Sequence, residues 1–138
     1  MINEYFKVLV VDLESSKSTV EKIDGRNRVA GGSGLAALLY TIYGHPDQGW
    51  DHPSQPFILA IGPLTGYYPL MSKTVCSFIS PYHSQYTESH GGGRSALALF
   101  FAGYDALVIV GRAAALSCLS VGSRHVQLKD TGFMKGVN

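Results

Sequence analysis

Apolar and polar residues alternate at both ends of the chain in a way that predicts hairpins. Tyr5 to Leu13 is rich in valine and aromatic residues, Glu14 to Lys17 is polar, and Ser18 to Ile23 alternates again. Strand-forming runs separated by a short polar turn are typical of a β-hairpin. The first part of the chain is therefore expected to form two antiparallel strands.

The segment "GGSGLAALLYTIYGHP" carries the clearest helical pattern. Its apolar residues recur at helical spacing and form one stripe, which consists of Leu35, Leu38, Leu39, Ile42 and Tyr43. Ser33 is expected to cap the start of this helix. Gly44 and Pro46 are expected to end it.

The middle of the chain alternates between apolar runs and turns. Phe57 to Ile61 is expected to be a strand that is buried on both faces, and "GPLTG" is expected to turn the chain after it. Thr74 to Ser80 is a further predicted strand, whereas Tyr82 to Glu88 is polar and aromatic and predicts no definite element. Ser95 to Ala102 is expected to be a short helix that ends at Gly103.

Three closely spaced strands are predicted in the last third, at Asp105 to Val110, Leu116 to Val121 and His125 to Leu128. Strands at hairpin spacing at both ends favour an α+β fold, with antiparallel sheets and two or three short helices, over a doubly wound fold. A length of 138 residues suits one domain.

Composition adds an expectation about partners. Apolar residues make up 46% of the chain and charged residues only 15%, which is below the usual quarter. So few charges leave apolar surface exposed, and such surface usually marks a partner interface. The formal net charge of +1 provides no basic field, so nucleic-acid binding is not expected.

Cys76 and Cys118 form no metal-binding motif and are expected to be buried thiols in a reducing compartment, although the sequence leaves a disulfide between them open. The chain has no apolar run long enough for a transmembrane helix, and its start lacks the basic region of a signal peptide. A cytoplasmic location without membrane contact is therefore expected.

Two glycine-rich segments precede the two predicted helices, "GGSG" at 31–34 and "HGGGR" at 90–94. A helix N-terminus presents unpaired N–H groups, and glycine lets an anion such as phosphate approach the backbone. The alternative is that glycine only makes the turn or allows close packing. Neither segment is a P-loop or a complete dinucleotide fingerprint, and no nucleophile elbow indicates a self-contained hydrolase.

The order of several motifs resembles a known family. "GGSGLAALLY", "FILAIGPLTG" and "GGGRSALALFFAGYDALVIVGRA" follow one another as in the N-terminal domain of the tungsten-containing aldehyde ferredoxin oxidoreductases. The first hairpin, "FKVLVVDLESSKSTVEKID", is similar as well. The resemblance runs from Tyr5 to Gly136, so residues 1–138 are expected to form a single domain similar to the first part of that N-terminal domain.

The resemblance implies a β-rich base for a tungsten or molybdenum ion that is held by two pterin cofactors, with magnesium bridging their phosphates. In the family a 4Fe–4S cluster lies beside the pterin, and aldehydes are oxidised with electrons passing to ferredoxin. The cluster cysteines belong to later domains that this sequence does not include. The resemblance thus implies either a small subunit whose large partner supplies the cluster and the substrate pocket, or a fragment of such an enzyme. For the chain alone, a homodimer that covers the open edge of the sheet is a further expectation.

Residue by residue, the resemblance assigns cofactor contacts to a small set of positions, and it assigns no catalytic residue and no metal ligand. Lys73, which follows Ser72, stands where the family has an arginine between pterin and cluster. Backbone groups of the HGGG segment would face the phosphates. The complete set of expected cofactor contacts is Ser72, Lys73, His90, Gly91, Gly92 and Gly93. Ser33 stands where many relatives have arginine, and Arg94 where an aromatic residue is frequent.

Three hypotheses remain from the sequence. The first is a small subunit or base domain that holds the pterin cofactor for an oxidoreductase. The second is an interaction or assembly module that keeps the fold without the cofactor, which the altered Ser33, Lys73 and Arg94 favour. The third is an independent β-domain that binds a small ligand.

Overall fold

The computed structural model describes residues 4–137 and contains two α-helices and eight strands. In chain order the elements are β1 (Tyr5–Asp12), β2 (Lys17–Asp24), α1 (Gly32–Tyr43), β3 (Phe57–Ile61), β4 (Thr74–Ile79), β5 (Tyr86–Gly91), α2 (Ser95–Ala102), β6 (Ala106–Val110), β7 (Ser117–Val121), β8 (Val126–Asp130) and the 3₁₀ helix η1 (Gly132–Met134).

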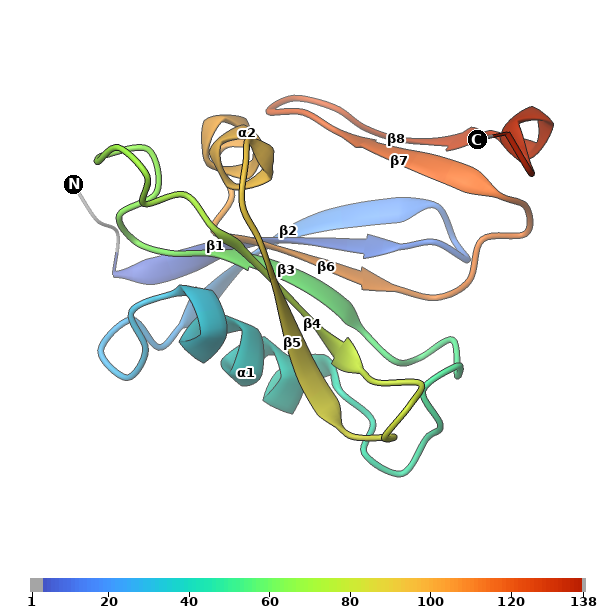
Figure 1. Cartoon of the computed structure of the whole chain (residues 1–138), viewed down its shortest axis with the longest axis horizontal. Coiled ribbons are helices and arrows are strands. Elements are labelled where there is room, and N and C mark those ends of the chain that lie inside the picture. The colour runs from blue at the N-terminus through green and yellow to red at the C-terminus, as the bar shows by residue number, and fades with distance from the viewer. Residues whose placement is uncertain (1–3, 138) are drawn as a thin grey trace.

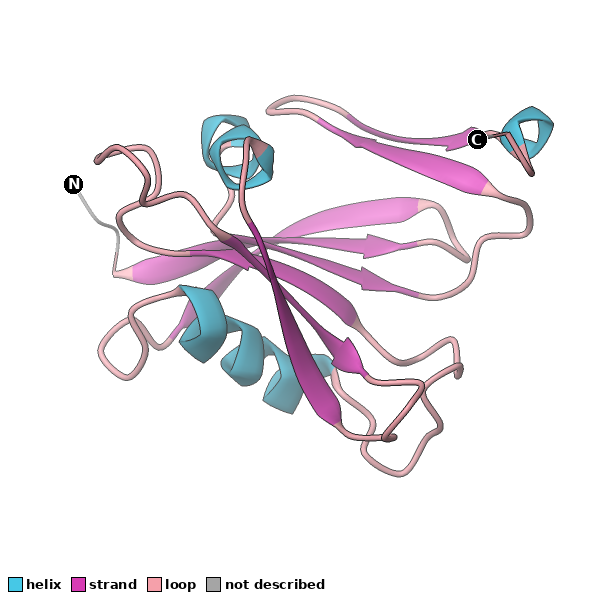
Figure 2. Cartoon of the chain, in the orientation of Figure 1, coloured by secondary structure: helices cyan, strands magenta, loops and turns pink. Residues whose placement is uncertain are grey.

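Six strands form one twisted sheet in the order β2-β1-β6-β3-β4-β5, and β7 and β8 pair as a separate hairpin (Figure 2). All neighbouring strands are antiparallel except β1 and β6, which run parallel. The first hairpin pairs without interruption from Tyr5 opposite Asp24 to Asp12 opposite Lys17. The prediction of an α+β fold with mainly antiparallel strands is confirmed.

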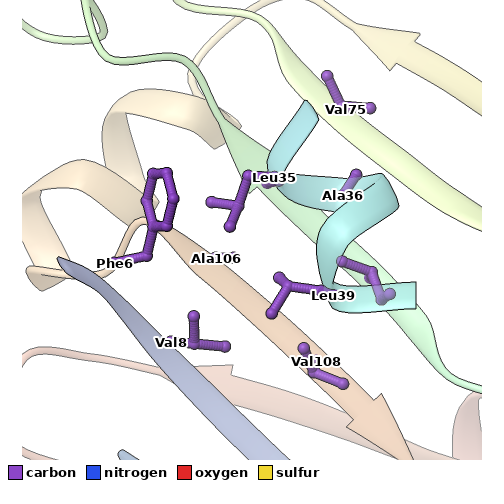
Figure 3. Close-up of a cluster of buried hydrophobic side chains, with 10 residues drawn as sticks. Phe6, Val8, Leu35, Ala36, Leu39, Val75, Ala106 and Val108 are labelled. Carbon is purple, nitrogen blue, oxygen red and sulfur yellow. The ribbon is translucent and has the colours of Figure 1, made fainter. Parts of the chain in front are cut away.

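The sheet is covered differently on its two faces (Figure 1). Helix α1 packs on one face, where Leu35, Ala36 and Leu39 are fully buried against side chains from β1, β3, β4 and β6 (Figure 3). Helix α2 and the β7–β8 hairpin lie over the other face, where Ala96 and Leu99 pack with Leu9, Val11 and Leu107. Because β1, β3 and β6 contribute to both clusters, the centre of the sheet is buried on both sides.

Helix α1 begins one turn earlier than its apolar stripe, and the predicted cap is wrong. Gly31 occupies the N-cap position, and no side chain within residues 4–137 caps the helix. Ser33 lies inside the first turn, because Gly31 (φ 143°) and Gly32 (φ 55°) make the preceding bend. The predicted end is confirmed, since the Gly44 N–H bonds the Tyr40 carbonyl after the last helical residue.

Strand β5 was not predicted as such. Tyr86 to Gly91 pairs with β4 along its whole length, so His90 and Gly91 belong to a strand and not to a loop. The glycine-rich link to α2 is therefore confined to Gly92, Gly93 and Arg94. The strand could not be predicted from the sequence because its residues are polar. Polar residues are common in a strand at the edge of a sheet.

Other predictions for the middle of the chain are refined by the structure. In β3, Ile58, Ala60 and Ile61 are buried, but Phe57 is exposed, because it lies at the end of the strand.

Both cysteines are free; Cys76 is half-buried and Cys118 is exposed, so the expectation of buried thiols is wrong for Cys118. Within residues 4–137, neither helix has the length and apolar character needed to cross a membrane.

Candidate functional site

The predicted cofactor residues meet at one end of the β4–β5 ladder. The ladder ends where Thr74 pairs with Gly91. Ser72 and Lys73 precede Thr74, and Gly92 and Gly93 follow Gly91, so both pairs of residues leave the sheet from the same end. His90 lies opposite Val75. The structure thus brings together, at the edge of the sheet, all six positions that the sequence singled out.

Glycines 91 to 93 border open space. Apart from the glycine and its two chain neighbours, a Cβ atom built on Gly91, Gly92 or Gly93 meets no atom of the described residues within 4 Å. Only Gly93 has a positive φ, of 93°, which the turn into α2 requires. Neither backbone conformation nor packing against the described residues requires glycine at positions 91 and 92. The backbone at these two positions therefore borders open space.

The GGSG segment is different, because the structure explains its glycines internally. A Cβ atom on Gly31 would lie 3.0 Å from the Ile61 carbonyl oxygen, and one on Gly34 would lie 3.0 Å from the Val29 Cβ. Gly32 has a φ of 55°. The simple interpretation, that these glycines make a turn and allow close packing, is sufficient here.

A cavity of about 390 Å³ lies between the start of α1 and the loop that leads into β4. Its walls come from three segments, namely Gly32, Gly62–Thr65 and Leu70–Lys73, and from Val75. Ser72 and Lys73 therefore line this cavity. His90 is next to it, because residues directly opposite in an antiparallel pair project to the same face and Val75 lines the cavity.

The N-terminus of α2 completes this end of the sheet. Arg94 occupies the N-cap position and no described side chain caps the helix, whose first internal bond runs from the Ala98 N–H to the Arg94 carbonyl. The amides of the first turn therefore remain available to an anion. A 2.7 Å hydrogen bond between the hydroxyls of Thr74 and Ser95 fixes the start of α2 to the start of β4.

Glu88 is a residue of this region that the sequence analysis did not single out. Its carboxylate accepts a hydrogen bond of 2.7 Å from the Tyr86 hydroxyl, and its other oxygen lies 3.5 Å from His90 Nε2. The Ser33 hydroxyl, followed by Tyr86 and the charge of His90, lowers the pKa of the Glu88 carboxyl. The spacing Tyr86–Glu88–His90 would have indicated one face of a strand, had β5 been recognised.

An uncharged apolar surface lies beside the cavity. Residues 64–71 and helix α2 contain no charged residue, and they expose Leu64, Tyr67, Tyr68, Leu70, Met71 and Phe101. Leu70 is 98% exposed and has a φ of 64°, which is unusual for a leucine. The Tyr67 and Phe100 rings, 5.6 Å apart, connect the loop with α2. The apolar surface expected from the composition is therefore present.

Comparison with known proteins shows the family to which the chain belongs. The family model described as "Aldehyde ferredoxin oxidoreductase, N-terminal domain" matches residues 8–138. The chain belongs to the aldehyde ferredoxin oxidoreductase family. The resemblance inferred from the sequence motifs is therefore confirmed.

Two relatives come from Pyrococcus furiosus. The chain is 28% identical to a tungsten-containing aldehyde ferredoxin oxidoreductase over 99% of its own length and 23% of that protein. It is 33% identical to the WOR-like subunit of an aliphatic sulfonate oxidoreductase over 90% of its length and 20% of that protein. The chain thus spans about a fifth of each relative.

A solved structure has the same fold. The active-site complex BamBC of benzoyl coenzyme A reductase, in complex with 1,5-dienoyl-CoA, contains a chain that superimposes with a TM-score of 0.88 at 27% identity. The match covers 96% of the present chain and 21% of that chain. The architecture is accordingly one that occurs as part of a larger polypeptide.

Proposed function

We propose that this chain is the base domain or small subunit of a tungsten or molybdenum bis-pterin oxidoreductase. In this proposal it binds the anionic parts of the cofactor, while a large subunit supplies the 4Fe–4S cluster and the substrate pocket. The observation that carries the proposal is the open glycine edge at Gly91 and Gly92, where a side chain would occupy space that nothing in the chain uses.

The residues at this edge suit phosphate groups. Gly92 and Gly93 are exposed residues, and their backbone amides and the uncapped first turn of α2 would provide hydrogen-bond donors. Lys73, at the wall of the cavity, adds a positive charge. A lysine ammonium neutralises a phosphate but does not form the bidentate hydrogen bonds of an arginine. Backbone amides would therefore contribute more of the phosphate binding here. Bound magnesium would reduce the repulsion between the phosphates.

The chemistry would come from the cofactor. When bound, the metal and its pterins would supply oxidation of an aldehyde to an acid, with the electrons leaving through the cluster of the large subunit to ferredoxin. The described residues of this chain would bind and orient the cofactor, and they would keep water from the side that faces the sheet.

The uncharged apolar surface supports the proposed partner. Interface centres are depleted in charged residues and enriched in Tyr, Phe and Met, which is the composition exposed on residues 64–71 and on α2. Since the same loop forms a wall of the cavity, a large subunit that covers this surface would also close the site. In the absence of that subunit, a homodimer would be the simplest way to cover it.

Metal analysis of the complex tests the proposal. The chain is co-purified with its large subunit, and tungsten and molybdenum are measured in the wild type and in a Lys73→Ala/His90→Ala variant. We expect metal in the wild-type complex and a loss of about tenfold in the variant. A matched variant, His125→Ala/Lys129→Ala, removes a histidine and a lysine from the exposed hairpin β7–β8 and is expected to retain the metal.

The second hypothesis, an assembly module without cofactor, predicts the opposite result. The module would form a stable complex through the apolar surface, and that complex would contain no tungsten or molybdenum. A complex whose metal content is unaffected by Lys73→Ala/His90→Ala would also contradict the proposed site.

A further inference from the structure

We infer that Glu88 is a positioning residue for His90, which it holds by Nε2 so that Nδ1 is the ring nitrogen presented to a ligand. This inference rests on the proposed function, because the ligand in question is the phosphate-bearing cofactor at the open glycine edge. It adds a residue, Glu88, to which the family resemblance gives no role.

The geometry of β5 carries the inference. Tyr86, Glu88 and His90 alternate along the strand and so share one face of the sheet. Glu88 Oε2 lies 3.5 Å from His90 Nε2, and Glu88 Oε1 accepts the Tyr86 hydroxyl at 2.7 Å. The Glu88 side chain is 22% exposed and that of His90 is 47% exposed. The carboxylate is thus anchored, while the imidazole still reaches solvent.

Helix α1 approaches the carboxylate from the other side. Ser33, in the first turn of α1, is near enough to lower the pKa of the Glu88 carboxyl. Tyr40, also on α1, packs its ring 5.2 Å from that of Tyr86. Glu88 therefore lies where α1 packs beside β5, and the segment that contains Ser33 comes close to the strand that leads into the second glycine-rich segment.

A carboxylate beside Nε2 decides which nitrogen is free. A carboxylate accepts hydrogen bonds and donates none when ionised, so the Nε2–H form of His90 is favoured. Nδ1 then remains available. It accepts a hydrogen bond when the ring is neutral and donates one to a phosphate oxygen when the ring is protonated. Carboxylates that orient a histidine in this way are frequent around ligand sites.

Nitrogen-15 NMR of the imidazole in the free chain tests the positioning directly. In the wild type at a pH where His90 is neutral, we expect the Nε2–H tautomer. In Glu88→Gln, Tyr86 and His90 compete for a single amide oxygen, and we expect a mixture of tautomers. Ser89→Ala changes a side chain that lies between Glu88 and His90 in sequence and so projects from the opposite face of β5, and it is expected to retain the wild-type tautomer. Glu88→Ala, which removes every acceptor, is the second variant in case the glutamine variant does not fold.

Metal retention by the complex then tests whether the positioning matters. We expect Glu88→Gln to lower the retained metal by about tenfold, and Ser89→Ala to leave it within about twofold of the wild type. An unchanged tautomer in both Glu88 variants overturns the inference. So does a changed tautomer with wild-type metal content. Failure of the proposed function would appear separately, as metal that is insensitive to Lys73→Ala/His90→Ala.

Discussion

The two glycine-rich segments look alike in the sequence, but they differ in the structure. In GGSG, Gly31 and Gly34 each lie so close to a neighbour that an added Cβ would be 3.0 Å from it. In HGGG, the same construction on any of the three glycines meets nothing within 4 Å. The first segment needs glycine for the fold. The second leaves its backbone open at an edge where Ser72 and Lys73 also emerge.

This difference shows that a glycine pattern before a helix has no single meaning. The same pattern allows α1 to pack tightly against the turn at Ile61–Pro63 and leaves space beside α2. Only the surroundings of each glycine separate a structural role from a binding role. The GGSG segment still contributes to the site, because Gly32 lines the cavity and Ser33 lies beside Glu88.

Alanine at position 31 is the strongest test of the structural role. Gly31 has a φ of 143° and its Cβ would lie 3.0 Å from the Ile61 carbonyl oxygen. Since neither the backbone nor a carbonyl group adjusts easily, we expect Gly31→Ala to lower the free energy of unfolding by about 2–3 kcal/mol. Urea denaturation measures the effect. Gly91→Ala, the matched control, is expected to stay within about 0.5 kcal/mol of the wild type, and equal stabilities of the two variants would contradict the comparison.

Valine at position 92 tests the binding role. Gly92 has no positive φ and no neighbour near its Cβ, so Gly92→Val is expected to fold normally. If a cofactor approaches the backbone there, the added side chain should reduce the metal retained by the complex about tenfold, or ~1.4 kcal/mol.

The control for this variant lies far along the chain. Gly49 belongs to an exposed loop, lacks a positive φ, and has only the Asp51 carboxylate near its Cβ, at 3.2 Å. Gly49→Val should therefore keep the metal. Full retention in Gly92→Val would mean that the open space at this edge has no ligand.

Much of the fold could be predicted because its signals are local. The stripe from Leu35 to Tyr43 predicted α1, and the left-handed Gly103 (φ 88°) ends α2 where expected. Strand β5 was not predicted because it lies at the edge of the sheet, where polar residues replace the apolar alternation that marks a strand. The parallel pairing of β1 with β6 joins segments almost a hundred residues apart, and no local pattern encodes it.

In the candidate site, too, the local motifs could be predicted and the long-range contacts could not. Lys73 and the three glycines could be selected from motifs, since each motif lies within a few consecutive residues. Their proximity depends on the pairing of Thr74 with Gly91, which only the structure reveals. Glu88 could not be selected from sequence, because its role depends on a tyrosine in the same strand and on a serine in α1.

The smallest expected effect concerns acid stability, and it tests how the two segments are joined. The Ser33 hydroxyl, then Tyr86 and the charge of His90, lower the pKa of Glu88 below its ordinary value of 4.5. A carboxyl whose pKa is lower in the folded state stabilises the fold above its unfolded pKa, and this stabilisation is lost as the pH falls through the folded pKa.

In Glu88→Gln the group no longer titrates. We therefore expect the free energy of unfolding to decrease less in the variant than in the wild type between about pH 6 and about pH 3. Ser33→Ala should give an intermediate decrease, because it removes only the largest of the interactions that lower this pKa. Parallel pH profiles of wild type and Glu88→Gln would show that Glu88 does not connect α1 with β5, and the two glycine-rich segments would then be neighbours without a shared carboxylate.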